Sequence, residues 1–172
     1  MFRIIVALFS LLSVVLAGPN EYDQVHTWMP RDYCNDPVSK YLVPGGQDLV
    51  SDLVVGRKKA STEVVPARVR TSTLQARYNG QNHAGTTSRN YDFLVAPEGV
   101  TFGWIPSKNG LSEPGAVAAG TNADGESVIV CRGNTTSGLI IGSLYPSKGL
   151  CYIWPENTSK VLLSDYEVLV SN

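Results

Sequence analysis

Short runs of Val, Ile, Leu and Tyr recur along the chain, each bounded by Gly, Pro, Asn, Asp or Ser. This pattern is typical of β-strands, and the dipeptides Asn79-Gly80, Asn109-Gly110 and Asp124-Gly125 are typical of tight hairpin turns. No window of 11 or more residues after residue 17 keeps apolar positions at helical spacing, so we expect little helix. The pattern predicts an all-β fold, with strands at residues 53–57, 63–69, 91–96, 127–132, 138–144, 151–154 and 166–170.

The longest apolar stretch lies at the N-terminus, over residues 4–17. One positive residue, Arg3, precedes it, and a small residue, Ala17, ends it. The stretch is shorter than a membrane span and has the features of a secretory signal peptide. We therefore expect residues 1–17 to be removed and the remaining chain to be secreted, without a membrane span; a buried helix or an uncleaved anchor is the alternative.

The rest of the chain repeats itself with a shift of about 75 residues. The displacement is 76 residues between Trp28 and Trp104, 74 between Gly46 and Gly120, and 75 between Arg57 and Arg132. Insertions or deletions of one residue therefore fall between these positions. We predict two homologous β-sheet units related by a pseudo-twofold axis, the first with a lead segment in residues 18–97 and the second in residues 98–172. The matched motifs are residues 28–30 with 104–106, 43–46 with 117–120, 54–57 with 129–132, and 91–95 with 166–170.

The repeated Trp28 and Trp104 are interpreted as packing residues, because each recurs in register with a Pro two positions later. Arg57 and Arg132 each follow a predicted strand, and we expect them to anchor the fold by hydrogen bonds to turns.

Composition and charge exclude several classes of function. Only 17% of the 172 residues are charged and the net charge is -1, so nothing attracts nucleic acid as a partner. The charge is unevenly distributed: seven basic and four acidic residues give +3 over residues 41–97, and four basic and seven acidic residues give -3 over residues 98–172. The two halves can attract each other within a chain or across a dimer.

The three cysteines, Cys34, Cys131 and Cys151, allow at most one internal disulfide. The sequence leaves all three pairings open; we favour Cys131 with Cys151, because both lie in predicted strands of one unit. Asn134 begins an N-x-Thr sequence and Asn157 an N-x-Ser sequence, so both are candidate N-glycosylation sites of a secreted protein.

Motifs of catalysis are missing from the sequence. His26 and His83 have no Cys or carboxylate partner at metal-ligand spacing, and no nucleophile elbow or phosphate-binding glycine loop is present. We predict no catalytic residue, no metal and no cofactor, and therefore no enzyme.

The order of motifs resembles the DM-nine repeat family over nearly the whole chain after the signal peptide. The second unit carries the family order in residues 119–120, 124–125, 130–132, 142–144, 148–152 and 166–170. The first unit is more diverged and keeps residues 46–48, 54–57 and 65–69.

This resemblance implies a tandem-repeat β fold and a role in invertebrate pathogen responses, where some members are dimeric mannose-binding lectins. In those lectins an Asp after an early Gly and a Lys in a Pro-Gly-Lys element hold the sugar. The matching positions here are Asp48 and Arg68 in the first unit, and Asn122 and Ser143 in the second. Arg68 keeps the positive charge with a planar fork, whereas Asn122 and Ser143 are neutral, so sugar binding is better supported in the first unit.

Two readings of these residues remain open. In the first, the chain is a secreted carbohydrate-binding protein that recognises mannose-type or microbial glycans, as a homodimer, through Asp48 and Arg68. In the second, Asp48 and Arg68 form a structural ion pair, and the chain is a structural or protein-interaction module whose sugar site has decayed.

Overall fold

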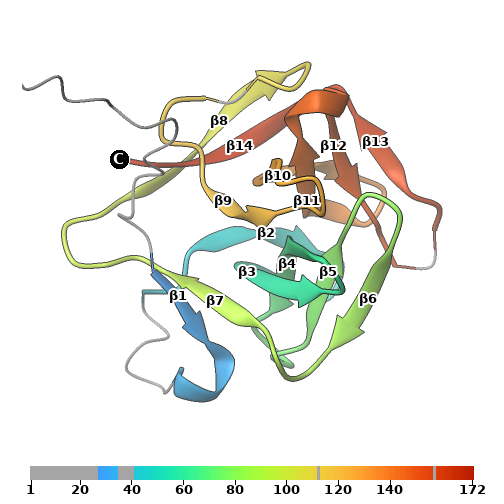
Figure 1. Cartoon of the computed structure of the whole chain (residues 1–172). Helices are drawn as coiled ribbons and strands as arrows, with labels where there is room; N and C mark the ends of the chain where they lie inside the picture. The colour runs from blue at the N-terminus through green and yellow to red at the C-terminus, as the bar shows by residue number, and fades with distance from the viewer. Residues whose placement is uncertain (1–26, 35–40, 112, 157) are drawn as a thin grey trace, which may run out of the picture.

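The computed structural model describes residues 27–34, 41–111, 113–156 and 158–172, which form an antiparallel all-β structure (Figure 1). The expected signal peptide, residues 1–17, lies outside the described residues. The strands before residue 98 are β1 (Thr27–Pro30), β2 (Pro44–Asp48), β3 (Asp52–Ala60), β4 (Glu63–Arg70), β5 (Ala76–Asn79), β6 (Ala84–Thr87) and β7 (Asp92–Val95). Those after it are β8 (Phe102–Lys108), β9 (Ala118–Thr121), β10 (Ser127–Thr135), β11 (Gly138–Tyr145), β12 (Leu150–Ile153), β13 (Val161–Leu163) and β14 (Asp165–Ser171).

The expectation of little helix is met in this part of the chain, where the helical segments are short 3-10 turns such as η1 (Arg31–Tyr33) and η3 (Pro146–Lys148). Over the same residues, no helix is long and apolar enough to cross a membrane.

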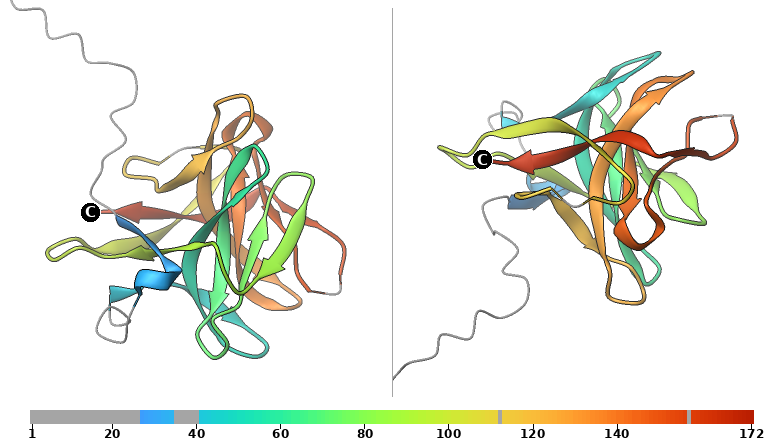
Figure 2. Two further views of the ribbon diagram at one scale, coloured as in Figure 1. Left: turned by 60° about the horizontal axis from the view of Figure 1, so that its bottom comes forward. Right: turned by 90° about the horizontal axis from the view of Figure 1, so that it is seen from above.

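Strands of each half pair in the same order. In residues 27–95, β3 pairs with β2, β4 and β7, while β1 adds to β7 and β5 and β6 follow β4. In residues 102–171, β10 takes the place of β3, with β9, β11 and β14 beside it and β8, β12 and β13 beyond. Pairing of β2 with β11, at Asp48 opposite Gly138, joins both halves into one sheet, and the views in Figure 2 show the two halves side by side.

All seven strands predicted from apolar runs are confirmed; five of them match within one residue at each end, and β3 and β10 run three residues further than predicted. Most of the strands that the pattern missed are short and lack such runs: β2 reads Pro-Gly-Gly-Gln-Asp and β9 reads Ala-Ala-Gly-Thr. The seven-residue β8 was also missed, because its run is broken by Gly103 and Pro106. Gly46 in β2 has a φ of +144°, and a Cβ there would lie 2.2 Å from the backbone oxygen of Leu139. Glycine is therefore needed where β2 approaches β11, although it weakens the strand pattern.

The repeated tryptophans and arginines pack on each other. The guanidinium of Arg57 lies 4.8 Å from the ring centre of Trp28, and that of Arg132 lies 4.3 Å from the ring centre of Trp104. Each arginine also pairs with a carboxylate on the neighbouring strand, Arg57 with Asp92 at 2.8 Å and Arg132 with Glu167 at 2.7 Å. The packing interpretation of the tryptophans is confirmed, but the arginines anchor strands and not turns, because their side chains extend across the sheet.

An apolar cluster with members from both halves lies between them. It contains Val43, Val55 and Leu94 of the first half with Val117, Val130, Ile141 and Leu169 of the second, and Trp28 and Trp104 pack against it. The halves therefore share buried surface, which ties the stability of each to the other.

A disulfide joins Cys131 on β10 to Cys151 on β12, which confirms the favoured pairing, and leaves Cys34 as a free thiol. The bridge crosses β11 at Gly142, where a Cβ would lie 2.9 Å from the sulfur of Cys151. Burial raises the pKa of the Cys34 thiol above its ordinary value, despite the opposing influence of Arg31.

The disulfide should stabilise the fold mainly by restricting the unfolded chain. Its cysteines are 20 residues apart, so replacing both by Ala should lower the free energy of unfolding by about 3 kcal/mol, because the unfolded chain regains the entropy of the open loop. Urea denaturation without reductant measures this loss. The matched control, Cys34→Ala, should change the free energy of unfolding far less, and an equal loss there would contradict the assignment.

Candidate functional site

The turn between β2 and β3 is organised by Asp48. One oxygen of its carboxylate accepts hydrogen bonds from the backbone N–H groups of Val50 and Ser51, both at 2.8 Å. Its other oxygen accepts from Nε of Arg70 at 2.7 Å. With three hydrogen bonds and a side chain only 5% exposed, Asp48 is largely occupied in holding this turn against β4.

Arg68 and Arg70 are two residues apart on β4, so their side chains leave the same face of the sheet. Arg70 joins two carboxylates, because it donates from Nε to Asp48 and from a terminal nitrogen to Glu156 at 2.8 Å. Arg68 makes no ion pair with either carboxylate. Both of its terminal nitrogens donate hydrogen bonds to the backbone oxygen of Trp154, each at 3.1 Å. Asp48 therefore pairs with Arg70 and not with Arg68.

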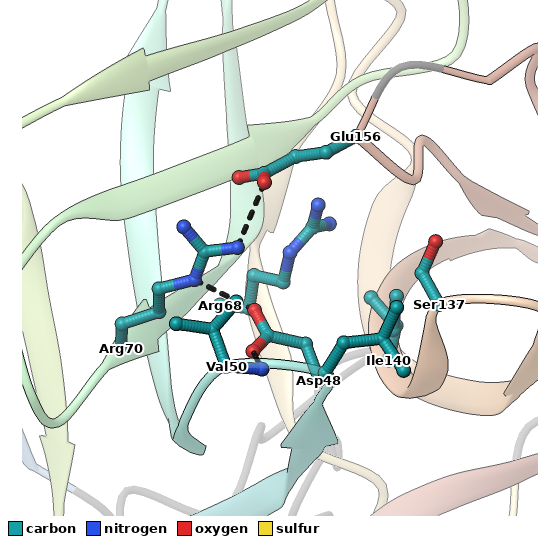
Figure 3. Close-up of a pocket in the computed structure, with 8 residues that line it drawn as sticks. Asp48, Val50, Arg68, Arg70, Ser137, Ile140 and Glu156 are labelled. Atoms are coloured by element: carbon teal, nitrogen blue, oxygen red, sulfur yellow. Dashed lines mark hydrogen bonds and ion pairs between the residues drawn. The ribbon is translucent and has the colours of Figure 1, made fainter.

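These groups line an open pocket of about 230 Å³ (Figure 3). The first half contributes the β2–β3 turn and β4, while the second half contributes the β10–β11 hairpin and the loop after β12. Three of the eight lining residues are apolar and five are polar or charged. The lining residues are Asp48, Leu49, Val50, Arg68, Arg70, Ser137, Ile140 and Glu156.

Electrostatics in the pocket set the charge states of its residues. Burial alone raises the pKa of Asp48, but the hydrogen bonds from Arg70 and from the backbone outweigh it, so the pKa falls below its ordinary value. Burial, followed by the nearby charge of Arg77, lowers the pKa of Arg68 to about 10. Hydrogen bonds to Asp48 and Glu156 raise the pKa of Arg70. All these groups are therefore ionised at neutral pH.

The second predicted pair, Asn122 and Ser143, bonds to separate segments. Asn122 accepts hydrogen bonds from the backbone N–H groups of Asp124 and Glu126, so it organises the β9–β10 turn much as Asp48 organises the β2–β3 turn. Ser143 on β11 is fully buried, and its hydroxyl donates to the backbone oxygen of Asn79. Ser143 cannot contact a sugar in this conformation.

The candidate glycosylation sites differ in what the structure describes. Asn134 is exposed near the end of β10, and Asn157 lies outside the described residues. Glycosylation at both remains a prediction.

Sequence reasoning missed most of the pocket. Arg70 could have been found from strand alternation, because it lies two residues after Arg68. No local pattern identifies Glu156 or Ser137, since they reach the pocket only when the second half docks on the first. Among the residues with described positions, no three His, Cys, Asp or Glu side chains gather as a metal site would require.

A comparison with protein-family models finds one match, described as DM9 repeat, over residues 48–162. The chain belongs to the DM9 repeat family. This confirms the DM-nine resemblance, and the DM9 match begins at Asp48 and includes every residue that lines the pocket. The match runs without a break past residue 97, so it does not itself divide the chain into two units. A comparison with curated proteins finds no matching relative.

The ion pair of Asp48 should make stability depend on pH. Because the pKa of Asp48 is lowered in the folded protein, its stabilisation is present above the ordinary pKa and is lost as the pH falls through the folded value. Asp48→Asn should therefore lower the free energy of unfolding by about 1 to 2 kcal/mol at pH 7, and this difference should shrink below about pH 4.

Urea denaturation between pH 3 and pH 7 measures this difference. The control is Asp52→Asn, at an exposed residue that begins β3, which should show little effect at any pH. A difference for Asp48→Asn that stays constant over this range would contradict the assigned role of the carboxylate.

Proposed function

We propose that this chain is a secreted, non-enzymatic carbohydrate-binding protein whose pocket at Asp48, Arg70 and Glu156 holds a saccharide unit of a glycan. The observation that carries the proposal is one open pocket in which hydrogen-bonding side chains face apolar ones. A sugar ring needs both, because its hydroxyls exchange hydrogen bonds while its C–H groups need apolar contact. Membership of the DM9 repeat family is compatible with this function.

Leu49 and Val50 supply the apolar contact. They are 81% and 70% exposed at the tip of the β2–β3 turn, although residues of this kind are usually buried. Ile140 forms the buried apolar floor beside them. A ligand ring lying against this turn would cover apolar surface that water now contacts, which favours binding.

The polar contacts come from residues that still have bonding capacity. Arg70 uses two of its five N–H groups in the contacts above, and Glu156 has a side chain 36% exposed. Ser137 adds a hydroxyl from the β10–β11 turn. In this proposal Asp48 positions Arg70, and the direct contacts fall to Arg70, Glu156 and Ser137. Mannose-type and microbial glycans, in an immune role, are the ligands that the family resemblance suggests.

We further propose that the two halves are homologous units related by a pseudo-twofold axis. Support comes from the common pairing order and from the paired turns at Asp48 and Asn122. Pairs Gly46–Leu53 and Gly120–Val128 differ by 74 residues on one strand and by 75 on the other, which places one extra residue in the second turn. Because single sugar sites bind weakly, dimerisation of the chain would add avidity.

Ser137→Trp tests the binding proposal, because the indole would fill the pocket without removing an ion pair. The wild type should bind immobilised glycans, and Ser137→Trp should reduce that binding by at least about tenfold, as expected when a binding site is sterically blocked. A glycan array followed by titration of the best ligand provides the measurement.

The control is Thr62→Trp, in the corresponding exposed turn between β3 and β4. It should bind like the wild type. No binding by the folded wild type would support the structural or protein-interaction role, and equal binding by Ser137→Trp would place the sugar elsewhere.

A further inference from the structure

We propose that the saccharide in this pocket is acidic, with a carboxylate group that binds Arg68 and Arg70. The proposal rests on the proposed function, since it specifies the class of sugar that the same pocket accepts. A uronic acid, in which a carboxylate replaces the C6 alcohol of a hexose, has the required chemistry.

The main observation is a buried cation without a carboxylate. Arg68 is only 3% exposed, yet no Asp or Glu oxygen among the described side chains lies within 4.0 Å of its nitrogens. Its hydrogen bonds go to one backbone oxygen, that of Trp154. In Figure 3 its guanidinium lies between Glu156 and Ser137, at the pocket, with no ion pair drawn to it. A buried cation of this kind is costly unless a negative partner offsets it.

The side chains around Arg68 carry more positive than negative charge. Arg77 on β5 donates to the same oxygen of Trp154 at 3.1 Å and to that of Pro155 at 3.3 Å. Arg68, Arg70 and Arg77 carry three positive charges, against two negative charges on Asp48 and Glu156. One carboxylate would balance the group, and the lowered pKa of Arg68, caused by burial and then by Arg77, is consistent with this excess.

Asp48 offers little to a neutral sugar. Its carboxylate is almost fully buried and already accepts three hydrogen bonds. The free capacity of the pocket consists mainly of the N–H groups of Arg68 and Arg70, which can only donate. A ligand that presents strong acceptors is therefore favoured over one that presents mostly hydroxyls.

Glu156 shows how such a ligand would bind. Its carboxylate comes from the loop after β12, is partly exposed, and accepts from a terminal nitrogen of Arg70 at 2.8 Å. The planar fork of a guanidinium matches a carboxylate in the same way whether the carboxylate belongs to a side chain or to a sugar. A ligand carboxylate would bind between Arg68 and Arg70, and the sugar ring would lie against Leu49 and Val50.

The first test compares two sugars that differ only at C6. Methyl glucuronide and methyl glucoside are titrated into the wild-type chain at equal ionic strength, and Kd is measured from NMR chemical-shift changes. The glucuronide should bind about tenfold more tightly, as expected for one added hydrogen-bonded charge pair.

The second test uses Glu156→Gln, which removes the carboxylate that competes with the ligand for Arg70 but keeps the side chain's size. Affinity for the glucuronide should rise about threefold, the effect of releasing a partly exposed ion pair, and affinity for the glucoside should not rise. The matched control is Glu98→Gln, which removes an equal charge from an exposed residue outside the pocket and should leave both affinities unchanged.

The outcomes separate this inference from the proposed function. Equal affinities for both sugars, or tighter binding of the glucoside, would overturn the acidic-sugar inference and leave carbohydrate binding intact. Loss of affinity for both sugars in Glu156→Gln would mean that Glu156 serves as an acceptor for ligand hydroxyls more than it competes with a ligand carboxylate for Arg70, and would also overturn the acidic-sugar inference. If neither sugar nor any arrayed glycan bound the folded protein, the proposed function would fail together with the inference.

Discussion

Buried hydrogen-bond donors on β4 and β11 constrain how the halves of this protein sit on each other. Arg68 on β4 donates to the backbone oxygen of Trp154, and Ser143 on β11 donates to the backbone oxygen of Asn79. Both donors are buried and each reaches the other half. Because a buried polar group without a partner is strongly unfavourable, the shared apolar cluster must pack in the one arrangement that satisfies both. The pocket depends on this arrangement, since its walls come from both halves.

Arg68 and Ser143, which the proposed duplication would align, make different contacts. Arg68 is long and charged, and it reaches the pocket beside Arg70, whereas Ser143 is short and its neighbour at the next position on that face is Tyr145. Tyr145 is fully buried, accepts from the backbone N–H of Gln81 and donates to Glu63. Two residues after Ser143, β11 thus carries a buried aromatic ring, whereas two residues after Arg68, β4 carries the guanidinium of Arg70. The residues at these two alternate strand positions thus give β4, but not β11, a charged side of the pocket.

How far the sequence predicts this protein depends on the range of each interaction. Apolar runs found the strands rich in Val and Ile, because the preference of these residues for strands acts locally. Short glycine-rich strands such as β2 were missed, since their pairing with β3 and with the distant β11 does not depend on apolar side chains of their own. Asp48 and Arg68 came from the family resemblance, and they do share a pocket, but the actual partner of Asp48 is Arg70. Glu156 and Ser137 could not be predicted, because their position follows from docking of the halves.

Because the pocket is lined by both halves, ligand binding in it is coupled to the docking of one half on the other. A ligand that touches the β2–β3 turn and the β10–β11 hairpin together has affinity only for the docked arrangement, so it shifts the equilibrium against any state in which the halves separate. Conditions that loosen the halves, such as loss of the bonds at Trp154 and Asn79, lower the apparent affinity even when every pocket residue is unchanged. Ligand binding at this pocket and the stability of the docked halves would therefore be thermodynamically linked through the contacts between the two halves.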